Sequence, residues 1–386
     1  MENVSLRCGK SDNAPRLRFP EFSGEWLSTT LGAIGTFTKG APLSKADIAS
    51  EGTPFILYGE LYTTYKEVTT EIKRRTLKTA NDECMSRVGD VIIPTSGETP
   101  DEIATATCIM VSNVILAGDL NIYRNSTIDG RFISYIINHV INGDISRIAQ
   151  GKSVVHIKAS ELAKLRINYP SRQEQNKIID FLMLLNRKIA KQQSLINALK
   201  TYKRGVIKQY FSAQKDNTKW TKSTISNCLF YEQPQKYIVH SEHYSNTYET
   251  PVLTANKAFI LGYTNELDGI YDKGDVLIYD DFTMEVKYVD FPFKVKSSTI
   301  KMLTPQSGID LYFMFTLLKS LDLQPEGHQR SYISILEPME VNIPCYEEQA
   351  RASGIFRLLD KQIEKEQQLL HKILDLKSSL LQKMFI

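Results

Sequence analysis

The chain has 386 residues, of which 42% are hydrophobic and 24% charged, with a formal net charge of +3. This composition is ordinary for a folded protein of two or three domains, and so small a charge does not by itself demand a nucleic-acid partner. No apolar run approaches the roughly 18 residues of a membrane span, and the N-terminus lacks a signal-peptide core, so we expect a cytoplasmic protein. Five scattered cysteines without a Cys-x-x-Cys pair suggest neither a disulfide framework nor a zinc site.

The first half of the chain is predicted to hold a tail, a globular domain and the start of a long helix. Residues 1–24 are assigned to an N-terminal tail. Residues 25–170 mix short strand-like segments, such as Gly89-Asp90-Val91-Ile92-Ile93, with an apolar helical stretch over 132–141. We therefore predict a globular domain of the α/β (α+β) class.

Residues 171–214 are predicted to form one uninterrupted helix. Its apolar residues step by alternating fours and threes, or by sevens where a polar residue intervenes, which is heptad spacing. At 1.5 Å per residue the helix would be roughly 55 to 60 Å long, too long to bury its apolar seam against a small domain. The predicted seam consists of Leu182, Leu185, Ile189, Ile196, Leu199 and Val206.

The second half of the chain repeats the first. Residues 161–211 recur without a gap 174 positions later, as 335–385. Landmarks in the globular part recur as well, with Trp26 echoed by Trp220 and Gly89-Asp90 by Gly274-Asp275. We therefore predict a second α/β domain over residues 215–346 and a second long helix over 347–386. The seam of that helix consists of Phe356, Leu359, Ile363, Leu370, Ile373 and Leu380.

The obvious partner for each long helix is the other one, in an antiparallel coiled coil. Gln192 and Lys203 interrupt the first seam in the same heptad positions in which Glu366 and Lys377 interrupt the second. One antiparallel register places Lys203 opposite Glu366 and Gln192 opposite Lys377, and we state it as a hypothesis. The alternative is that each polar side chain reaches out to water.

Antiparallel pairing would place the two domains at opposite ends of a pseudo-two-fold symmetric chain. Two similar domains at a fixed separation suit the reading of two separate sites on duplex DNA, whose major-groove faces recur about every 34 to 36 Å. Homodimerisation through the helices is less favoured, because one chain already supplies both strands of the coil.

Candidate DNA contacts come from basic clusters and from polar loops that follow apolar strands. Basic residues cluster at Lys73-Arg74-Arg75 with Lys78, and at Lys294, Lys296 and Lys301. Base readout needs polar side chains on loops, whereas phosphate contacts need lysine, arginine, hydroxyls or amides. For any single residue the alternative is an ordinary surface position. The candidates are Tyr62, Lys66, Arg74, Arg75, Ser96 and Lys152 in the first half, and Asn256, Lys257, Thr283, Lys287 and Arg330 in the second.

Three features make the chain resemble one family over essentially its whole length. They are the opening Pro15-Arg16-Leu17-Arg18-Phe19-Pro20-Glu21-Phe22-Ser23-Gly24-Glu25-Trp26, the Pro170-x-x-x-Glu174-Gln175 motif repeated as Pro344-x-x-x-Glu348-Gln349, and the repeat of domain and helix. In their order and spacing they resemble the specificity subunit of type I restriction-modification enzymes.

The resemblance implies two target-recognition domains that read the halves of a bipartite DNA site, with the helices setting the unread gap. It also implies partners: double-stranded DNA, two copies of an adenine-N6 methyltransferase subunit, and motor-nuclease restriction subunits active in phage defence. No cofactor would be bound by this chain. S-adenosylmethionine, Mg and ATP would belong to the partner subunits.

Several fragments resemble enzyme motifs without completing them. The Asn/Asp-Pro-Pro-aromatic tetrapeptide of an amino-methyltransferase is missing, and Gly151-Lys152-Ser153 follows Ser146 where a phosphate loop needs glycine. Asp275, Asp280 and Glu285-Val286-Lys287 resemble a magnesium nuclease only superficially. His240 and His243 lack further ligands. We therefore predict a non-catalytic chain, with neither catalytic nor metal-binding residues, and the alternative is a coiled-coil scaffold without sequence-specific DNA binding.

Overall fold

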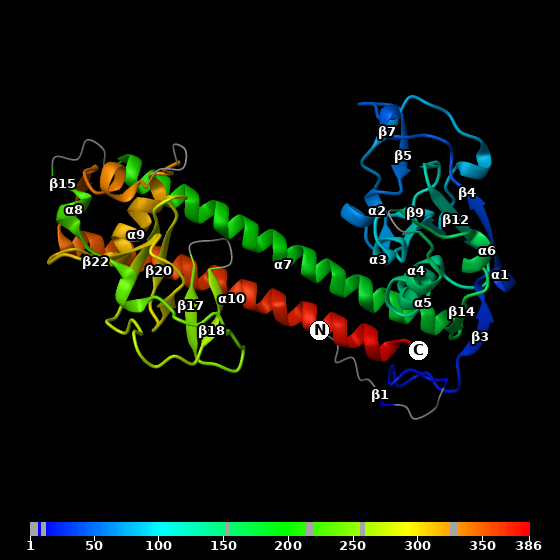
Figure 1. The fold of residues 1–386 in the computed structure, drawn as a ribbon. Coiled ribbons are helices and arrows are strands. Elements are labelled where there is room, and N and C mark those ends of the chain that lie inside the picture. Colours follow the sequence, from blue (N-terminus) through cyan, green and yellow to red (C-terminus); the bar gives the residue numbers. More distant parts are fainter. Residues whose placement is uncertain (1–6, 9–12, 152–153, 214–218, 255–258, 325–329) are drawn as a thin grey trace. The chain divides into compact units, whose positions relative to one another are not determined.

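The computed structural model describes residues 7–8, 13–151, 154–213, 219–254, 259–324 and 330–386 (Figure 1). These residues form two compact units. Unit 1 contains residues 1–191 and 370–386, and unit 2 contains residues 192–369. Among the described residues, no helix combines the length and the apolarity that crossing a membrane requires.

Unit 1 is built on a five-stranded sheet with the order β4-β12-β8-β10-β6. All neighbours in it are antiparallel except β10 and β6, which are parallel. Helix α4 contacts β8 and β10 of this sheet and is buried along most of its length. The bounds are β4 Gly35–Lys39, β6 Val68–Thr69, β8 Asp90–Pro94, β10 Thr107–Ile109, β12 Leu120–Asn125 and α4 Gly130–His139.

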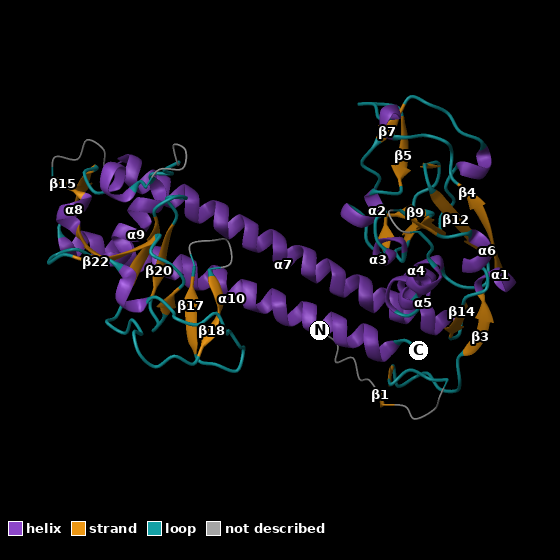
Figure 2. Cartoon of the chain, viewed as in Figure 1, coloured by secondary structure: helices purple, strands orange, loops and turns teal. Residues whose placement is uncertain are grey.

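Smaller elements of unit 1 surround this sheet. Strands β11, β5 and β7 form a three-stranded sheet, and β1-β2, β3-β14 and β9-β13 are strand pairs. Short helices and turns connect them (Figure 2). The bounds are β1 Arg7–Cys8, β2 Leu17–Arg18, β3 Leu27–Thr30, α1 Leu31–Ile34, β5 Thr53–Leu57, α2 Glu60–Thr63, β7 Arg75–Thr76, β9 Ser96–Gly97, α3 Pro100–Ile103, β11 Ile115–Ala117, α5 Asn142–Ile148, β13 Val155–His156, α6 Ala159–Leu162 and β14 Arg166–Tyr169.

Unit 2 repeats this plan with one strand fewer in its main sheet. The four-stranded sheet has the order β16-β22-β19-β20, and β18-β17-β21 and β15-β23 form a three-stranded sheet and a pair. Helix α9 contacts β19 and β20 as α4 contacts β8 and β10. The bounds are β15 Thr221–Thr224, α8 Ile225–Cys228, β16 Leu229–Glu232, β17 Thr250–Leu253, β18 Ile260–Thr264, β19 Val276–Asp280, β20 Val286–Val289, β21 Lys294–Val295, β22 Ile300–Pro305, α9 Leu311–Ser320, a π-helix Tyr332–Leu336 and β23 Glu340–Ile343.

Two long helices, α7 (Arg172–Ala213) and α10 (Tyr346–Met384), contribute to both units. In unit 1, Ile178 and Leu182 of α7 share the apolar core with Ile373 and Leu380 of α10. In unit 2, late residues of α7 such as Val206 pack with the early residue Phe356 of α10. Every residue of the two predicted seams is buried or half-buried.

The predicted register of these helices is wrong. Gln192 Nε2 donates to the Glu366 carboxylate at 2.6 Å and to its backbone carbonyl at 3.0 Å. Lys203 Nζ pairs with Asp360 at 2.5 Å, and Asp360 precedes Glu366 by more than one helical turn. Lys377, which was expected to face Gln192, pairs with Glu67 in unit 1 at 3.0 Å. The long lysine side chains reach carboxylates outside the predicted positions, so heptad slots alone did not fix the alignment.

The glutamine of each Pro-x-x-x-Glu-Gln motif fixes the start of a long helix to its own unit. The Gln175 amide donates to the Pro170 carbonyl at 2.9 Å and accepts from the Asp129 backbone N–H at 2.8 Å. Gln349 makes the same contacts with Pro344 and Asp310, both at 2.9 Å. Asp129 and Asp310 are the N-caps of α4 and α9. One buried side chain therefore holds two helix starts together in each unit.

The glutamates of these motifs have different partners in the two units. Glu174 is 1% exposed and accepts two hydrogen bonds, both of 2.7 Å, from the guanidinium of Arg18 in the opening segment. Glu348 instead accepts from the Trp220 indole N–H at 3.2 Å. The N–H of the corresponding Trp26 is buried without a partner among the described residues.

Candidate nucleic-acid interface

Arg74 lies at a buried carboxylate in unit 1. Its Nε is 3.0 Å from Glu60 Oε1, and the Glu60 side chain is 4% exposed against 34% for Arg74. The other oxygen of Glu60 accepts from the Leu57 backbone N–H at 3.1 Å. The guanidinium therefore compensates a charge that α2 brings inside, so much of its role is to hold α2 against β5.

The neighbouring basic residues point into solvent. Arg75 is exposed, and its Nη1 donates to the Gly52 carbonyl at 3.0 Å. The Lys73 backbone N–H donates to the Tyr65 hydroxyl at 2.9 Å, which links the segment before β7 to the residue that precedes Lys66. We call Lys66, Lys73, Arg75 and Lys78, all exposed, the basic surface of unit 1. Exposed cations on an ordered strand and its flanking turns are suited to phosphate contacts.

Tyr62 and Ser96 are joined to each other. The Tyr62 hydroxyl donates to the Ser96 carbonyl at 2.8 Å, and the Ser96 hydroxyl donates to Asp119 at 3.0 Å. Ser96 is 5% exposed, and burial raises the pKa of Tyr62 far above its usual value. Both hydroxyl groups form hydrogen bonds inside the unit. Tyr62 and Ser96 therefore support the loop 97–99 structurally.

In unit 2, Thr283, Lys287 and Arg330 surround the turn after β19. Thr283 is exposed, the Lys287 ammonium lies 4.7 Å from the centre of the Phe259 ring, and Arg330 is 66% exposed at 4.0 Å from Asp281. Asp281 is 1% exposed and accepts from the backbone N–H groups of Ser331 and Tyr332 at 3.1 and 2.9 Å. The carboxylate therefore fixes the segment that presents Arg330. Lys152, Asn256 and Lys257 lie outside the described residues.

The predicted basic cluster of the second half is mostly internal. Lys294 is fully buried, with its ammonium 2.7 Å from Glu266 and 2.7 Å from the Asp268 carbonyl. Lys301 is 6% exposed and pairs with Asp281 at 3.2 Å, and Lys296 pairs with Glu242 at 2.5 Å. Although partial burial opposes ionisation, hydrogen bonds from Lys294 and from backbone amides lower the pKa of Glu266 to about 2. Lys294 and Lys301 pair with carboxylates inside the unit and Lys296 pairs with the exposed Glu242, so this sequence cluster of positive charge does not form a basic patch.

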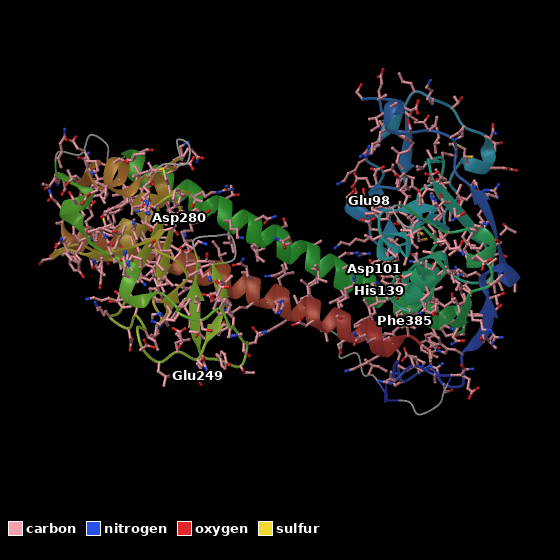
Figure 3. The ribbon with its side chains drawn as sticks, in the orientation of Figure 1. Glu98, Asp101, His139, Glu249, Asp280 and Phe385 are labelled. Carbon is pink, nitrogen blue, oxygen red and sulfur yellow. The ribbon has the colours of Figure 1, made fainter. Side chains whose placement is uncertain are left out.

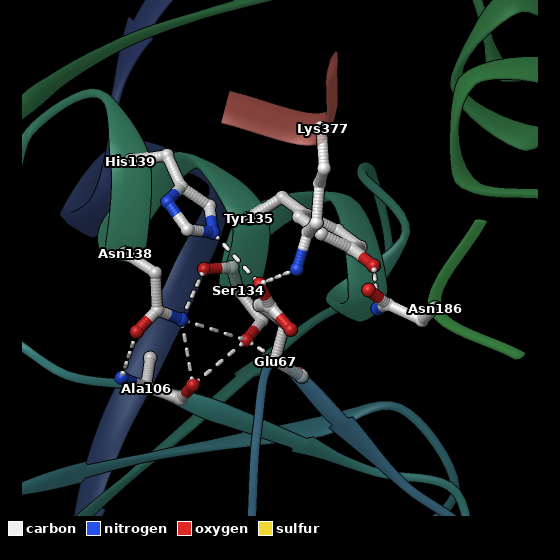
Figure 4. A network of polar contacts seen from close by, with 8 residues as sticks. All are labelled: Glu67, Ala106, Ser134, Tyr135, Asn138, His139, Asn186 and Lys377. Carbon is white, nitrogen blue, oxygen red and sulfur yellow. Dashed lines mark hydrogen bonds and ion pairs between the residues drawn. The ribbon is translucent and has the colours of Figure 1, made fainter. Parts of the chain in front are cut away.

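A polar network in unit 1 that sequence reasoning missed ties α10 to the globular part (Figure 4). Glu67 Oε1 lies 2.8 Å from His139 Nε2 and 3.0 Å from Lys377 Nζ. Burial opposes ionisation of Glu67, but the His139 hydrogen bond and the charge of Lys377 lower its pKa to about 2. The sequence signal that could have predicted this network is the lysine shared by the two seams, Lys203 and Lys377. A lysine in an apolar seam needs a carboxylate nearby, as Asp360 is for Lys203.

The end of α10 is seated in the same unit by aromatic contacts. The ring of Phe385 lies 5.3 Å from that of Phe132 and 6.5 Å from that of Trp26, measured between centroids. Tyr135 of α4 stacks on the ring of Phe385, and Phe385 is labelled in Figure 3. Phe385 and its repeat counterpart Phe211 therefore serve the core.

Among the described residues, the carboxylates of the fragments that resemble enzyme motifs form hydrogen bonds within the fold. The Asp275 carboxylate accepts from the Tyr288 hydroxyl, and Asp280 accepts from the Phe282 backbone N–H at 2.8 Å. Within the described part of the chain, no three His, Cys, Asp or Glu side chains are grouped as metal ligands.

Comparison with known proteins gives one family. The family model of the type I restriction modification DNA specificity domain matches residues 23–201. The specificity subunit of the Escherichia coli type I restriction enzyme EcoR124I/EcoR124II is 45% identical over 141 residues, which cover 34% of this chain and 35% of that protein. The match thus spans about a third of the length of this curated relative.

Two solved structures share the fold. The S subunit of a type I restriction-modification system from M. genitalium has a TM-score of 0.66 at 16% identity, covering 97% of this chain and 99% of that chain. A chain from work on complex assembly and conformational transition of the type I R-M system has a TM-score of 0.56 at 15% identity, covering 93% of this chain and 97% of that chain. Both likenesses are to chains of mixed α and β content.

Proposed function

We propose that this chain, whose residues 23–201 match the family model of the type I restriction modification DNA specificity domain, is the DNA sequence-recognition subunit of a type I restriction-modification complex. Units 1 and 2 each read one half of a bipartite DNA site. The single observation that carries this proposal is the internal repeat: each unit holds a similar main sheet, a helix packed on it and a long helix whose start is held by a glutamine, while the loops differ. Different loops on equal frameworks imply different half-sites, hence an asymmetric target.

In this proposal α7 and α10 form an antiparallel coiled coil that sets the unread gap. The contact between Gln192 and Glu366 supports it, because the two residues are 174 positions apart and therefore equivalent in the repeat. In an antiparallel pair of repeat-related helices, equivalent residues contact each other only at the pseudo-two-fold axis that relates the two helices. The gap would then depend on how many residues separate that pair from the start of each long helix.

Partner subunits would dock on the outer faces of these helices. Leu184 and Leu358 are equivalent, identical and 63% and 68% exposed, and Leu195 and Leu369 are likewise identical at 44% and 42% exposed. Because eleven residues make about three turns, the two leucines of each helix lie on one face. Two copies of the same apolar stripe suit two copies of one partner, which we assign to the adenine-N6 methyltransferase subunit. Motor-nuclease restriction subunits would complete the complex.

Chemistry would belong to those partners. S-adenosylmethionine, Mg and ATP would be bound there, and this chain would supply recognition and assembly. Acting on DNA, the complex would work in the cytoplasm. Among the candidate contacts, we assign phosphate binding to the exposed Lys66, Arg75, Thr283 and Arg330 and to the half-buried Lys287. We assign support of the reading loops to Tyr62, Arg74 and Ser96. Lys152, Asn256 and Lys257 stay on the list of contacts.

Single-molecule methylation sequencing tests the proposal. DNA is taken from cells that express this chain with its methyltransferase partner, the partner alone, or the chain alone. An N6-methyladenine motif with two unlike halves around a fixed gap, present only with both proteins, is the expected result. A palindromic motif would contradict the assignment of different half-sites. Absence of any motif beside an active partner, with assembly intact, would favour a scaffold that does not read sequence.

A further inference from the structure

A groove of about 1330 Å³ lies within unit 2, between the second half of α7, helix α9 and the first half of α10. Its rim carries the exposed cations Lys200, Arg204 and Lys208 of α7 and Lys319 of α9. Its floor is apolar, with Ile207, Phe211 and Phe315 among the lining residues. The DNA-reading role assigned above leaves this groove unused.

The corresponding place in unit 1 is filled by the chain itself. The Asp129 and Asp310 caps align α4 with α9, so Ser134 and His139 correspond to Phe315 and Ser320. In unit 1 the Ser134 hydroxyl donates to the Glu67 carbonyl at 2.6 Å, while His139 and Lys377 bind the Glu67 carboxylate. The counterparts Phe315, Ser320 and Lys203 all line the groove. The groove therefore occupies the site where unit 1 seats Glu67.

Strand β6 explains the difference. It begins next to Glu67 and adds in parallel to β10, where the Cys108 and Met110 N–H groups donate to the Glu67 and Thr69 carbonyls at 2.8 and 2.9 Å. The segment that carries β6 spans residues 58–74, whereas its counterpart between β17 and β18 spans only 254–259. In the described part of unit 2, β20 is consequently the outermost strand of its sheet. Among its described residues, unit 2 retains the seat for an added strand but has no strand in it.

We propose that this groove binds an extended acidic peptide segment of a partner protein, seated as Glu67-Val68-Thr69 is seated in unit 1. Charge complementarity identifies the segment: four exposed cations rim the groove, and the only carboxylates among the residues that line it are Asp322, Glu340 and Asp360. Asp360 is already paired with Lys203. A carboxylate followed by β-branched residues would meet the cations and extend along the apolar floor toward the edge of β20. The apolar floor favours a peptide over a DNA phosphate backbone, which does not need apolar contacts.

A peptide with the sequence of residues 64–71, labelled with fluorescein, is the probe. Fluorescence anisotropy with the full chain should show saturable binding that a Glu67→Lys version of the peptide lacks. Arg204→Glu with Lys319→Glu should weaken binding at least about tenfold. The matched control, Lys188→Glu with Lys191→Glu, changes the same charge on exposed α7 positions outside the groove and should leave binding unchanged. Ser320→Trp should block binding by filling the groove without changing charge.

Three outcomes would overturn the assignment. One is the absence of saturable binding by the wild-type peptide. Another is equal weakening by the groove pair and the control pair, which would mean nonspecific attraction. The third is unchanged peptide binding with reduced affinity for a DNA duplex in the groove pair, which would make the groove a nucleic-acid surface. Circular dichroism checks that each variant is folded. Peptide binding needs no methyltransferase and no methylated motif, so its failure is distinguishable from failure of the recognition role.

Discussion

The Gln192 amide donates to the Glu366 carboxylate, and each residue is the repeat counterpart of the other. A single polar pair thus fixes the alignment of α7 against α10 within unit 2, at a seam that is otherwise apolar around Ile196 and Ile363. A buried polar pair in a coiled coil specifies register at some expense of stability.

Gln192→Leu alone should lower the free energy of unfolding by about 1 to 2 kcal/mol, because the half-buried Glu366 loses a donor. Adding Glu366→Leu should restore that loss or exceed it, since both positions then match the apolar seam. Urea denaturation followed by circular dichroism measures the free energy of unfolding of the wild type, the two single variants and the double variant. Additive effects of the two substitutions would show that the pair is not coupled.

Glu67 should make the stability of unit 1 depend on pH. Its pKa is lowered from 4.5 to about 2 in the folded chain. The stabilisation is therefore complete above pH 4.5 and is lost as pH falls toward 2, and it amounts to something on the order of 3 kcal/mol. Glu67→Gln should flatten the stability profile over this range. Denaturation between pH 2.5 and 7 tests it, and parallel profiles for the two proteins would contradict a stabilising role for the contacts of Glu67 with His139 and Lys377.

Arg74 and Arg75 form a matched pair with opposite expected effects. Arg75→Ala should weaken DNA binding and lower the slope of log affinity against log salt by about 0.9, the value for one phosphate contact. Arg74→Ala should instead cost about 1 to 3 kcal/mol of stability, because Glu60 is left buried without its cation. Salt-dependent binding and denaturation of both variants make the comparison. If Arg74→Ala changed the salt slope and Arg75→Ala did not, the two assignments would be reversed.

Lys294 should act on the loop that contains His240 and Ser241. Glu266 accepts from their backbone N–H groups at 3.0 and 2.7 Å while it is held by Lys294. Lys294→Met should cost about 3 to 5 kcal/mol by leaving a carboxylate unpaired. Hydrogen exchange at these two amides should accelerate. Lys222→Met, which removes the charge of an exposed lysine of β15, is the control and should leave their exchange unchanged.

The long helices were predictable from sequence because a heptad pattern has a single geometric solution over many turns. Helix α7 ends at Ala213 and α10 begins at Tyr346, each within a residue of the predicted range. Register was not predictable, because Lys203 and Lys377 can reach carboxylates more than a turn away or on another element, as Asp360 and Glu67 show.

The candidate DNA contacts show the same limit of prediction from sequence. Sequence identified polar loop residues but could not separate the exposed Arg75 from Arg74, which is paired inside the unit. Nor could it recognise Lys294 as fully buried, since its carboxylate partner Glu266 lies on another strand–turn segment. Pairing between distant segments decides whether a cation faces solvent, and a linear charge cluster carries no such information.

In hybrid chains assembled from halves of different relatives, the two halves differ in where the partner of the motif glutamate comes from. A first half that begins at Trp26 would bury Glu174 without Arg18 and so carry an uncompensated charge at the root of its long helix. A second half that begins at Trp220 brings its own donor for Glu348. The junction for recombination should therefore lie before Arg18 for the first half and directly before Trp220 for the second half.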